Sequence, residues 1–101
     1  MSGTRVTRTV TILNSQGLHA RPAEMFAKCA SRFESCIVVI KEGNRVDAKS
    51  ILHVLTLAAE SGTELVLEAD GSDAEDALEA LSRLVGSGFA LDGNTSQQQS
   101  G

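Results

Sequence analysis

The sequence predicts an α+β fold of two layers, an open-faced β-sandwich in which helices cover one face of a sheet. Segments that alternate apolar and polar residues, or are continuously β-branched, stand between segments whose apolar residues recur at helical spacing. Their order along the chain is strand, helix, strand, strand, helix, strand, helix, which gives two packed layers. The 101 residues, 42% of them hydrophobic, suffice for one small core.

The first strand and the first helix meet at a short polar turn. Val6, Val10 and Ile12 alternate mostly with threonines, as in a half-buried strand. The turn at 14–17 follows, and residues 21–33 then carry one apolar stripe at helical spacing, made of Ala23, Phe26, Ala27, Ala30 and Phe33. Proline in a first helical turn costs no hydrogen bond and discourages helix at the residue before it. A histidine therefore lies just outside the helix N-terminus.

A hairpin and a second, short helix are expected next. Residues 36–41 form a continuous, mostly β-branched run, residues 42–44 a turn, and residues 45–48 a returning strand. Residues 49–57 carry leucine and isoleucine at helical spacing and predict a helix that ends before Gly62. Ser50 is expected to be the N-cap of this helix.

A fourth strand, a third helix and a tail complete the chain. Residues 63–69 alternate as a half-buried strand does. Ser72 followed by Glu75 is a capping-box pattern, and helical spacing then continues up to Gly86. Residues 90–101 are polar and are expected to be a disordered tail. The expected domain is therefore 4–89.

Composition excludes several classes of function. A net charge of −4 and the absence of Trp and Tyr argue against a nucleic-acid surface. No apolar run approaches the roughly 18 residues of a membrane span, and we expect a cytoplasmic protein. Cys29 and Cys36 have neither the spacing nor the neighbours of a zinc site, and both are expected to be reduced thiols. No metal or other cofactor is expected.

His19 is the candidate reactive residue. A helix N-terminus offers unpaired N–H groups and a partial positive charge, which bind anions and favour a neutral imidazole. Such an imidazole can accept a phosphoryl group. Arg21, two residues on, is a planar cation suited to phosphate oxygens, and Ala20 is too small to cover the site. The ordinary alternative is that the histidine is a surface residue or a cap.

The stretch Gly17-Leu18-His19-Ala20-Arg21-Pro22-Ala23 resembles the active-site motif of the histidine-containing phosphocarrier protein (HPr) family of the bacterial phosphoenolpyruvate-dependent phosphotransferase system. A second family signature stands at Ala48-Lys49-Ser50-Ile51-Leu52. The resemblance runs without a gap from about Thr4 to about Phe89. It implies a βαββαβα chain folded as a four-stranded antiparallel sheet with three helices on one face.

The resemblance implies a phosphocarrier with no turnover of its own. His19 would take a phosphoryl group on Nδ1 from phosphorylated Enzyme I, which is charged from phosphoenolpyruvate, and pass it to a histidine of a IIA-type protein. Arg21 and Ala20 would bind the phosphate. The sequence itself does not distinguish the two ring nitrogens. A regulatory phosphorelay role outside sugar transport stays open.

The same resemblance implies a regulatory site and a docking surface. Ser50 falls on the serine that HPr kinase/phosphorylase modifies in many bacteria, and this role is compatible with a helix cap. The residues expected to contact partners are Ala20, Lys28, Lys49, Ile51 and Leu52. His53 is expected to be a surface residue, because no arginine lies beside it. The expected molecule is a monomer that neither binds nucleic acid nor inserts into membranes.

Two features depart from the family pattern, and other functions stay open. Glu24 stands where a small residue is usual, so a carboxylate lies one helical turn from Ala20. Val38, Ile40 and Val66 add apolar residues to the sheet face that should be wet, which predicts weak self-association or cover from residues 89–91. An enzyme using His19 as general base lacks a Ser, Cys or acidic partner in the motif. A ferredoxin-like interaction module would leave the histidine incidental.

Overall fold

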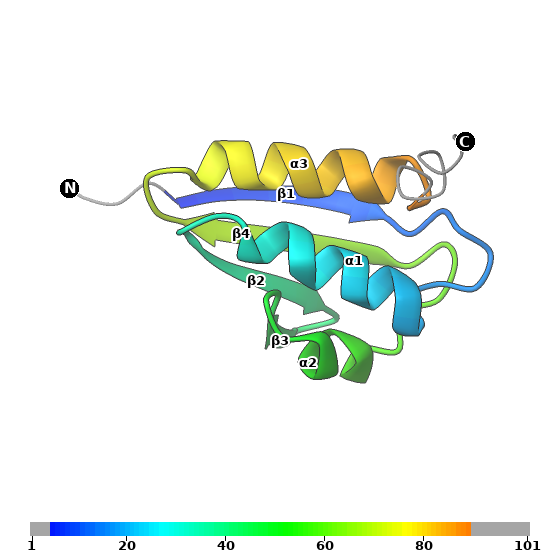
Figure 1. The fold of residues 1–101 in the computed structure, drawn as a ribbon. Helices are drawn as coiled ribbons and strands as arrows, with labels where there is room; N and C mark the ends of the chain where they lie inside the picture. The colour runs from blue at the N-terminus through cyan, green and yellow to red at the C-terminus, as the bar shows by residue number, and fades with distance from the viewer. Residues whose placement is uncertain (1–4, 90–101) are drawn as a thin grey trace.

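A computed structural model describes residues 5–89 and shows one four-stranded sheet. The strands are β1 (Arg5–Thr11), β2 (Cys36–Lys41), β3 (Asn44–Asp47) and β4 (Glu64–Asp70). They stand in the order β1-β4-β2-β3, and every neighbouring pair is antiparallel. The helices are α1 (Ala20–Ser31), α2 (Ile51–Thr56) and α3 (Ala74–Gly86) (Figure 1). The predicted order of elements is confirmed.

The sheet is amphipathic because its residues alternate. Val10 of β1 lies opposite Leu65 of β4, and Val39 of β2 lies opposite Leu67 of β4. All four are buried, whereas their chain neighbours on the other face are not. Successive side chains of a strand point to opposite faces, so one side of the sheet is left for the helices.

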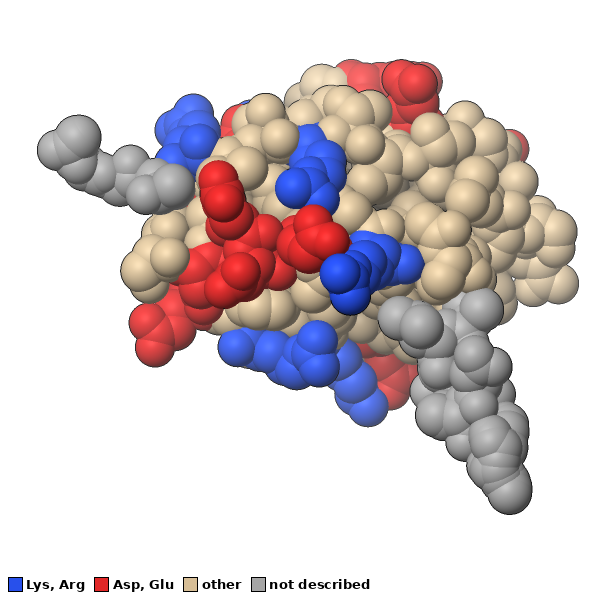
Figure 2. Space-filling view, turned by 90° about the horizontal axis from the view of Figure 1, so that it is seen from above, with Lys and Arg blue, Asp and Glu red and all other residues tan. Residues whose placement is uncertain are grey.

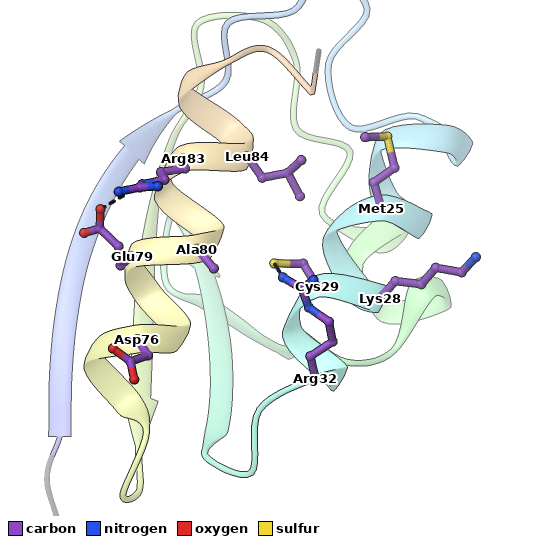
Figure 3. Close-up of a pocket in the computed structure, with 9 residues that line it drawn as sticks. All are labelled: Met25, Lys28, Cys29, Arg32, Asp76, Glu79, Ala80, Arg83 and Leu84. Carbon is purple, nitrogen blue, oxygen red and sulfur yellow. Dashed lines mark hydrogen bonds and ion pairs between the residues drawn. The ribbon is translucent and has the colours of Figure 1, made fainter. Parts of the chain in front are cut away.

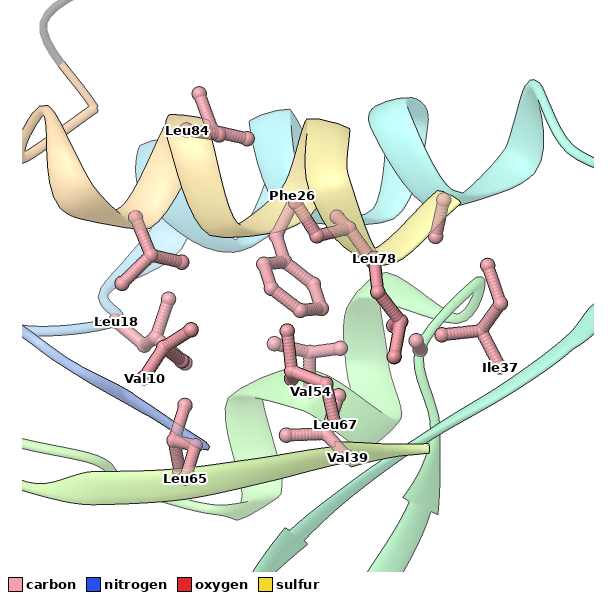
Figure 4. Close-up of a cluster of buried hydrophobic side chains, with 14 of the residues drawn as sticks. Val10, Leu18, Phe26, Ile37, Val39, Val54, Leu65, Leu67, Leu78 and Leu84 are labelled. Carbon is pink, nitrogen blue, oxygen red and sulfur yellow. The ribbon is translucent and has the colours of Figure 1, made fainter. Parts of the chain in front are cut away.

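The core fills the space between this face and the helices (Figure 4). Phe26 of α1, Val54 of α2 and Leu78 of α3 have no solvent-exposed surface, and they meet Leu65 and Leu67 of the sheet. Removing one such side chain from water contributes about 1.5–3 kcal/mol. The apolar stripe predicted for the first helix is the face of α1 that packs here.

The start of α3 differs from the prediction. A capping box that begins at Ser72 is wrong, because the N-cap of α3 is Asp73. The Asp73 side chain makes no bond to its own helix. It accepts instead from the backbone N–H groups of Glu34 at 2.9 Å and Ser35 at 3.0 Å, and from the Ser35 hydroxyl. The side chain at the N-cap position is thus engaged by residues far away in the chain instead of capping the helix.

The outer face of the sheet is partly covered by charged side chains. Arg45 lies opposite Ile40, and Glu68 lies opposite Val38; Arg45 Nη2 and Glu68 Oε1 are 2.5 Å apart. This ion pair crosses the face diagonally, and Val38, Ile40 and Val66 are half-buried rather than exposed. The expected cover by residues 89–91 is wrong for Phe89, which packs in the core cluster. Residues 90 and 91 lie outside the described part of the chain, as does the predicted tail.

Both cysteines are free thiols: Cys29 is half-buried in α1, and Cys36 is exposed at the start of β2. Within residues 5–89, no group of three or more His, Cys, Asp or Glu side chains is placed to hold a metal ion. In the same residues no helix has the length and apolar character to cross a membrane.

Candidate functional site

His19 is the N-cap of α1. Its backbone is extended, with φ −83° and ψ −167°, and its carbonyl oxygen accepts from the Ala23 N–H at 3.0 Å. The imidazole makes no capping hydrogen bond and is exposed. The backbone of His19 therefore starts the helix, while its ring stays available at the end where the positive pole of the helix lies.

The loop before His19 is held by hydrogen bonds on both sides. Asn14 Nδ2 donates to the Gly17 carbonyl at 2.7 Å, and the Gly17 N–H donates to the Asn14 carbonyl at 3.1 Å. The Leu18 N–H donates to the carbonyl of Ala59, which follows α2, at 2.8 Å, and the Leu18 side chain is buried. These bonds fix the residue that immediately precedes the histidine.

Gly17 permits this contact because it has no side chain. Its φ is +74°, a region that L-residues with a Cβ rarely adopt. A Cβ at this position would lie 2.4 Å from the Ala59 oxygen. The site loop could not rest on the segment after α2 with any other residue here.

An open hollow of about 340 Å³ lies beside the imidazole. His19 and Arg21 form its reactive side, and its walls include Asn14, Met25, Gly88 and Phe89. The first sequence motif predicted His19 and Arg21. Sequence reasoning missed the walls from Gly88 and Phe89, since no local signal shows that the end of α3 lies next to the first loop.

The charges around the hollow come from the first turns of α1. Arg21 is exposed and lines the hollow, and Ala20 is exposed beside it. The unexpected carboxylate of Glu24 lies 3.5 Å from Lys28 Nζ, one turn further along the helix. Lys28 therefore offsets part of the negative charge that Glu24 brings near the site, although an exposed pair of this kind is weak.

The second motif lies at the start of α2. Ser50 is the N-cap, as predicted, and its Oγ accepts from the His53 N–H at 3.3 Å. Leu52 is 74% exposed and Ile51 39% exposed, and the His53 side chain is also at the surface. Lys49 Nζ donates to the Phe33 carbonyl at 2.8 Å and so ties this corner to the end of α1. Because α2 packs against α1, the two motifs lie on neighbouring elements.

Comparison with known proteins agrees with this geometry. Residues 6–87 match the family model described as the PTS HPr component phosphorylation site. The chain belongs to the HPr family. HPr proteins are phosphocarriers of the phosphotransferase system.

Individual HPr relatives cover most of the chain. The phosphocarrier protein HPr of Treponema pallidum is 45% identical over 84 residues, which are 83% of this chain and 96% of the relative. The crystal structure of HPr-C-His from Thermoanaerobacter tengcongensis matches with a TM-score of 0.82 and 42% identity, covering 84% of this chain and 96% of the other. An HPr dimer from the same organism matches with a TM-score of 0.68 and 44% identity, covering 79% and 92%. The predicted HPr fold is confirmed.

Proposed function

We propose that His19 accepts a phosphoryl group from phosphorylated Enzyme I and passes it to a histidine of a IIA-type protein. The observation that carries the proposal is the exposed imidazole of His19, the N-cap residue of α1, which makes no capping hydrogen bond and shares a hollow with Arg21. His19 is thus the proposed phosphorylation site, phosphorylated Enzyme I the proposed donor, and a IIA-type protein the proposed acceptor.

The chemistry is a transfer between two imidazoles. A lone pair on a neutral His19 ring nitrogen attacks phosphorus, one P–N bond forms as the donor's P–N bond breaks, and the donor imidazole leaves. The family resemblance assigns this nitrogen as Nδ1. The transition state spreads charge over the phosphoryl oxygens, and the first-turn N–H groups of α1 and the Arg21 guanidinium can stabilise that charge. In the second transfer a ring nitrogen of the acceptor's histidine attacks phosphorus, the new P–N bond forms as the His19 P–N bond breaks, and the His19 imidazole leaves.

Docking is proposed to use the surface formed by the start of α1 and by α2. Ile51 and Leu52 supply exposed apolar area, Ala20 allows close approach, and Lys28 supplies a positive charge. Lys49 contributes less directly, because its ammonium group already bonds the Phe33 carbonyl. Ser50 lies at the edge of this surface, which is why its modification by HPr kinase/phosphorylase is proposed to regulate docking.

The decisive test is phosphate uptake by His19→Ala. With Enzyme I and labelled phosphoenolpyruvate, the unaltered protein should take up one acid-labile, base-stable phosphate, and His19→Ala should take up none. Its fold should be retained because the side chain is exposed and makes no capping bond. His53→Ala is the matched control and should label normally. Acid-labile label on a folded His19→Ala protein would overturn the assignment.

Arg21→Lys tests whether the guanidinium positions phosphate. Lysine keeps the positive charge but loses the planar set of donors, so transfer should slow by about tenfold without being abolished. Arg45→Lys, on the outer face of the sheet, is the control and should transfer at the normal rate. The measurement is the single-turnover rate with phosphorylated Enzyme I, and equal rates for Arg21→Lys and the unaltered protein would contradict the role.

A further inference from the structure

A second hollow, separate from His19, lies between α1 and α3 and has about 580 Å³ of space (Figure 3). Its volume falls in the range of small-molecule sites, roughly 300–1,000 Å³. Met25 of α1 and Ala80 and Leu84 of α3 form an apolar part, and charged side chains stand around it. We call this hollow the α1–α3 groove.

Some charged side chains of the groove have an oppositely charged partner, and others do not. Both carboxylate oxygens of Glu79 are occupied, Oε1 by Arg8 Nη1 at 3.1 Å and Oε2 by Arg83 Nε at 3.0 Å. Lys28 is paired with Glu24. In the described residues, Arg32 has no carboxylate partner, and Asp76 on the opposite helix has no cationic one. Seen from above, acidic residues gather at one end of this side of the molecule, with basic residues beside them (Figure 2).

Arg32 is directed toward the groove by its neighbours. Arg32 Nη2 lies 3.7 Å from Cys29 Sγ, a long contact from a good donor to a weak acceptor, and its guanidinium carbon lies 5.9 Å from the centre of the Phe33 ring. Burial raises the pKa of the Cys29 thiol, an effect that Arg32 only partly offsets. The sulfur is therefore a neutral thiol near pH 7 and does not neutralise the guanidinium. Most of the donors of Arg32 are left for another acceptor.

We propose that the α1–α3 groove binds a small organic monoanion, a carboxylate attached to an apolar body. The carboxylate meets the Arg32 guanidinium, and the body lies on Met25, Ala80 and Leu84. Aromatic or aliphatic carboxylates fit this arrangement.

The test is an NMR titration of the full chain with 3-phenylpropanoate and 3-phenylpropanol. For a ligand of this size on an open groove, the expected Kd for 3-phenylpropanoate is about millimolar. Amide signals of α1 and α3 that face the groove should move. The uncharged alcohol should bind at least about fivefold more weakly, because it lacks the charge-assisted bond to Arg32.

Variants separate the specific contact from general charge attraction. Arg32→Gln should weaken 3-phenylpropanoate binding by about tenfold, and Arg5→Gln, which removes the same charge from the outer sheet face, should leave it unchanged. Asp76→Asn, which removes a negative charge from the opposite wall of the groove, should strengthen 3-phenylpropanoate binding. All three positions are exposed, so folded spectra are expected. The proposal is overturned if 3-phenylpropanoate does not bind at tens of millimolar, if the moving signals lie elsewhere, or if Arg32→Gln binds as well as Arg5→Gln. None of these readouts depends on phosphate transfer at His19.

Discussion

Gly17 brings the loop before His19 into contact with the segment after α2. We expect Gly17→Ala to destabilise the protein by about 2 kcal/mol or more, since it combines a positive φ with a Cβ placed 2.4 Å from the Ala59 oxygen. Gly62→Ala is the control, with φ +90° but nothing within 4 Å of the added carbon, and should lose only about 1 kcal/mol. Urea unfolding of both variants measures the difference. Equal losses would show that the contact with Ala59 does not constrain the loop.

The reactive residues were easier to predict than their surroundings. His19 and Arg21 belong to one short motif, and the proline after them indicates the first turn of a helix, although Arg21 before it is itself helical. The remaining walls of the hollow come from distant residues, among them Gly88 and Phe89. Nothing in the residues themselves indicates this, because their placement depends on how α3 packs against the sheet.

Asp73 connects the start of α3 to the loop before β2. Hydrogen bonds from the Ser35 hydroxyl and then from the Glu34 N–H lower the pKa of Asp73. A carboxyl with a lowered pKa in the folded state stabilises the fold fully above its unfolded pKa, about 3.9. That stabilisation is lost as the pH falls through the lower folded value.

We therefore expect Asp73→Asn to be less stable than the unaltered protein at pH 7. The difference should narrow as the pH falls below about 4, because the unaltered protein then loses the charge that the variant never had. Asp76→Asn, which removes a carboxylate without such bonds, is the control. Thermal unfolding between neutral and strongly acidic pH gives the measurement. A stability difference that is constant across this range would contradict the role of the carboxylate.

Substitutions of Ser50, the N-cap of α2, should affect both stability and docking. Aspartate is a good N-cap, so Ser50→Asp should fold normally, whereas Ser50→Ala should lose about 1 kcal/mol. The added charge lies beside Ile51 and Leu52, and it should raise the apparent KM of Enzyme I for the carrier by about tenfold. The phosphorylation rate of His19 as a function of carrier concentration measures this effect.

A control variant makes the Ser50 result interpretable. Ser72→Asp places the same charge on an exposed residue before α3, and its KM should stay near normal. A normal KM for a fully folded Ser50→Asp protein would mean that Ser50 is only a helix cap in this step.

Helices and strands were predictable to within about two residues at most boundaries, since burial follows the periods of two and 3.6 residues. The short α2 is one example: residues 49–57 were expected, and Ile51–Thr56 are helical. The start of α3 was not predictable in the same way. Ser72 and Glu75 fit a capping box, but the Asp73 side chain accepts hydrogen bonds from Glu34 and Ser35. Sequence periodicity cannot predict such a long-range bond.

Self-association of the whole molecule should depend on whether its outer sheet face is covered. Arg45→Ala removes the side chain that crosses this face to Glu68 and should expose Val38 and Ile40 to a second copy. In sedimentation velocity the variant should sediment faster as its concentration rises, whereas Arg83→Ala, on the helical side, should not. Identical behaviour of both variants would show that the ion pair does not limit association.

The periodicity of the sequence alone did not predict the architecture of the whole molecule. Alternation indicated two layers, and the resemblance to HPr added a four-stranded antiparallel sheet with three helices on one face, but neither gave the strand order β1-β4-β2-β3. The α1–α3 groove was not predicted at all. Arg32 and Asp76 are ordinary surface charges in the sequence, and only the packing of two helices on one sheet face places them on opposite sides of a hollow.

The position of β4 also has a consequence for how the protein is made. β4 is the last strand in the chain, yet it lies between β1 and β2, and in the described sheet β1 pairs with β4 alone. During synthesis the β2–β3 hairpin can form early, while β1 leaves the ribosome long before its partner does. The hydrogen bond from the Leu18 N–H cannot form until Ala59 has been synthesised. A nascent chain that ends before Ala59 thus holds His19 on a loop without this bond, and β1 gains its partner strand only once Glu64–Asp70 have been translated.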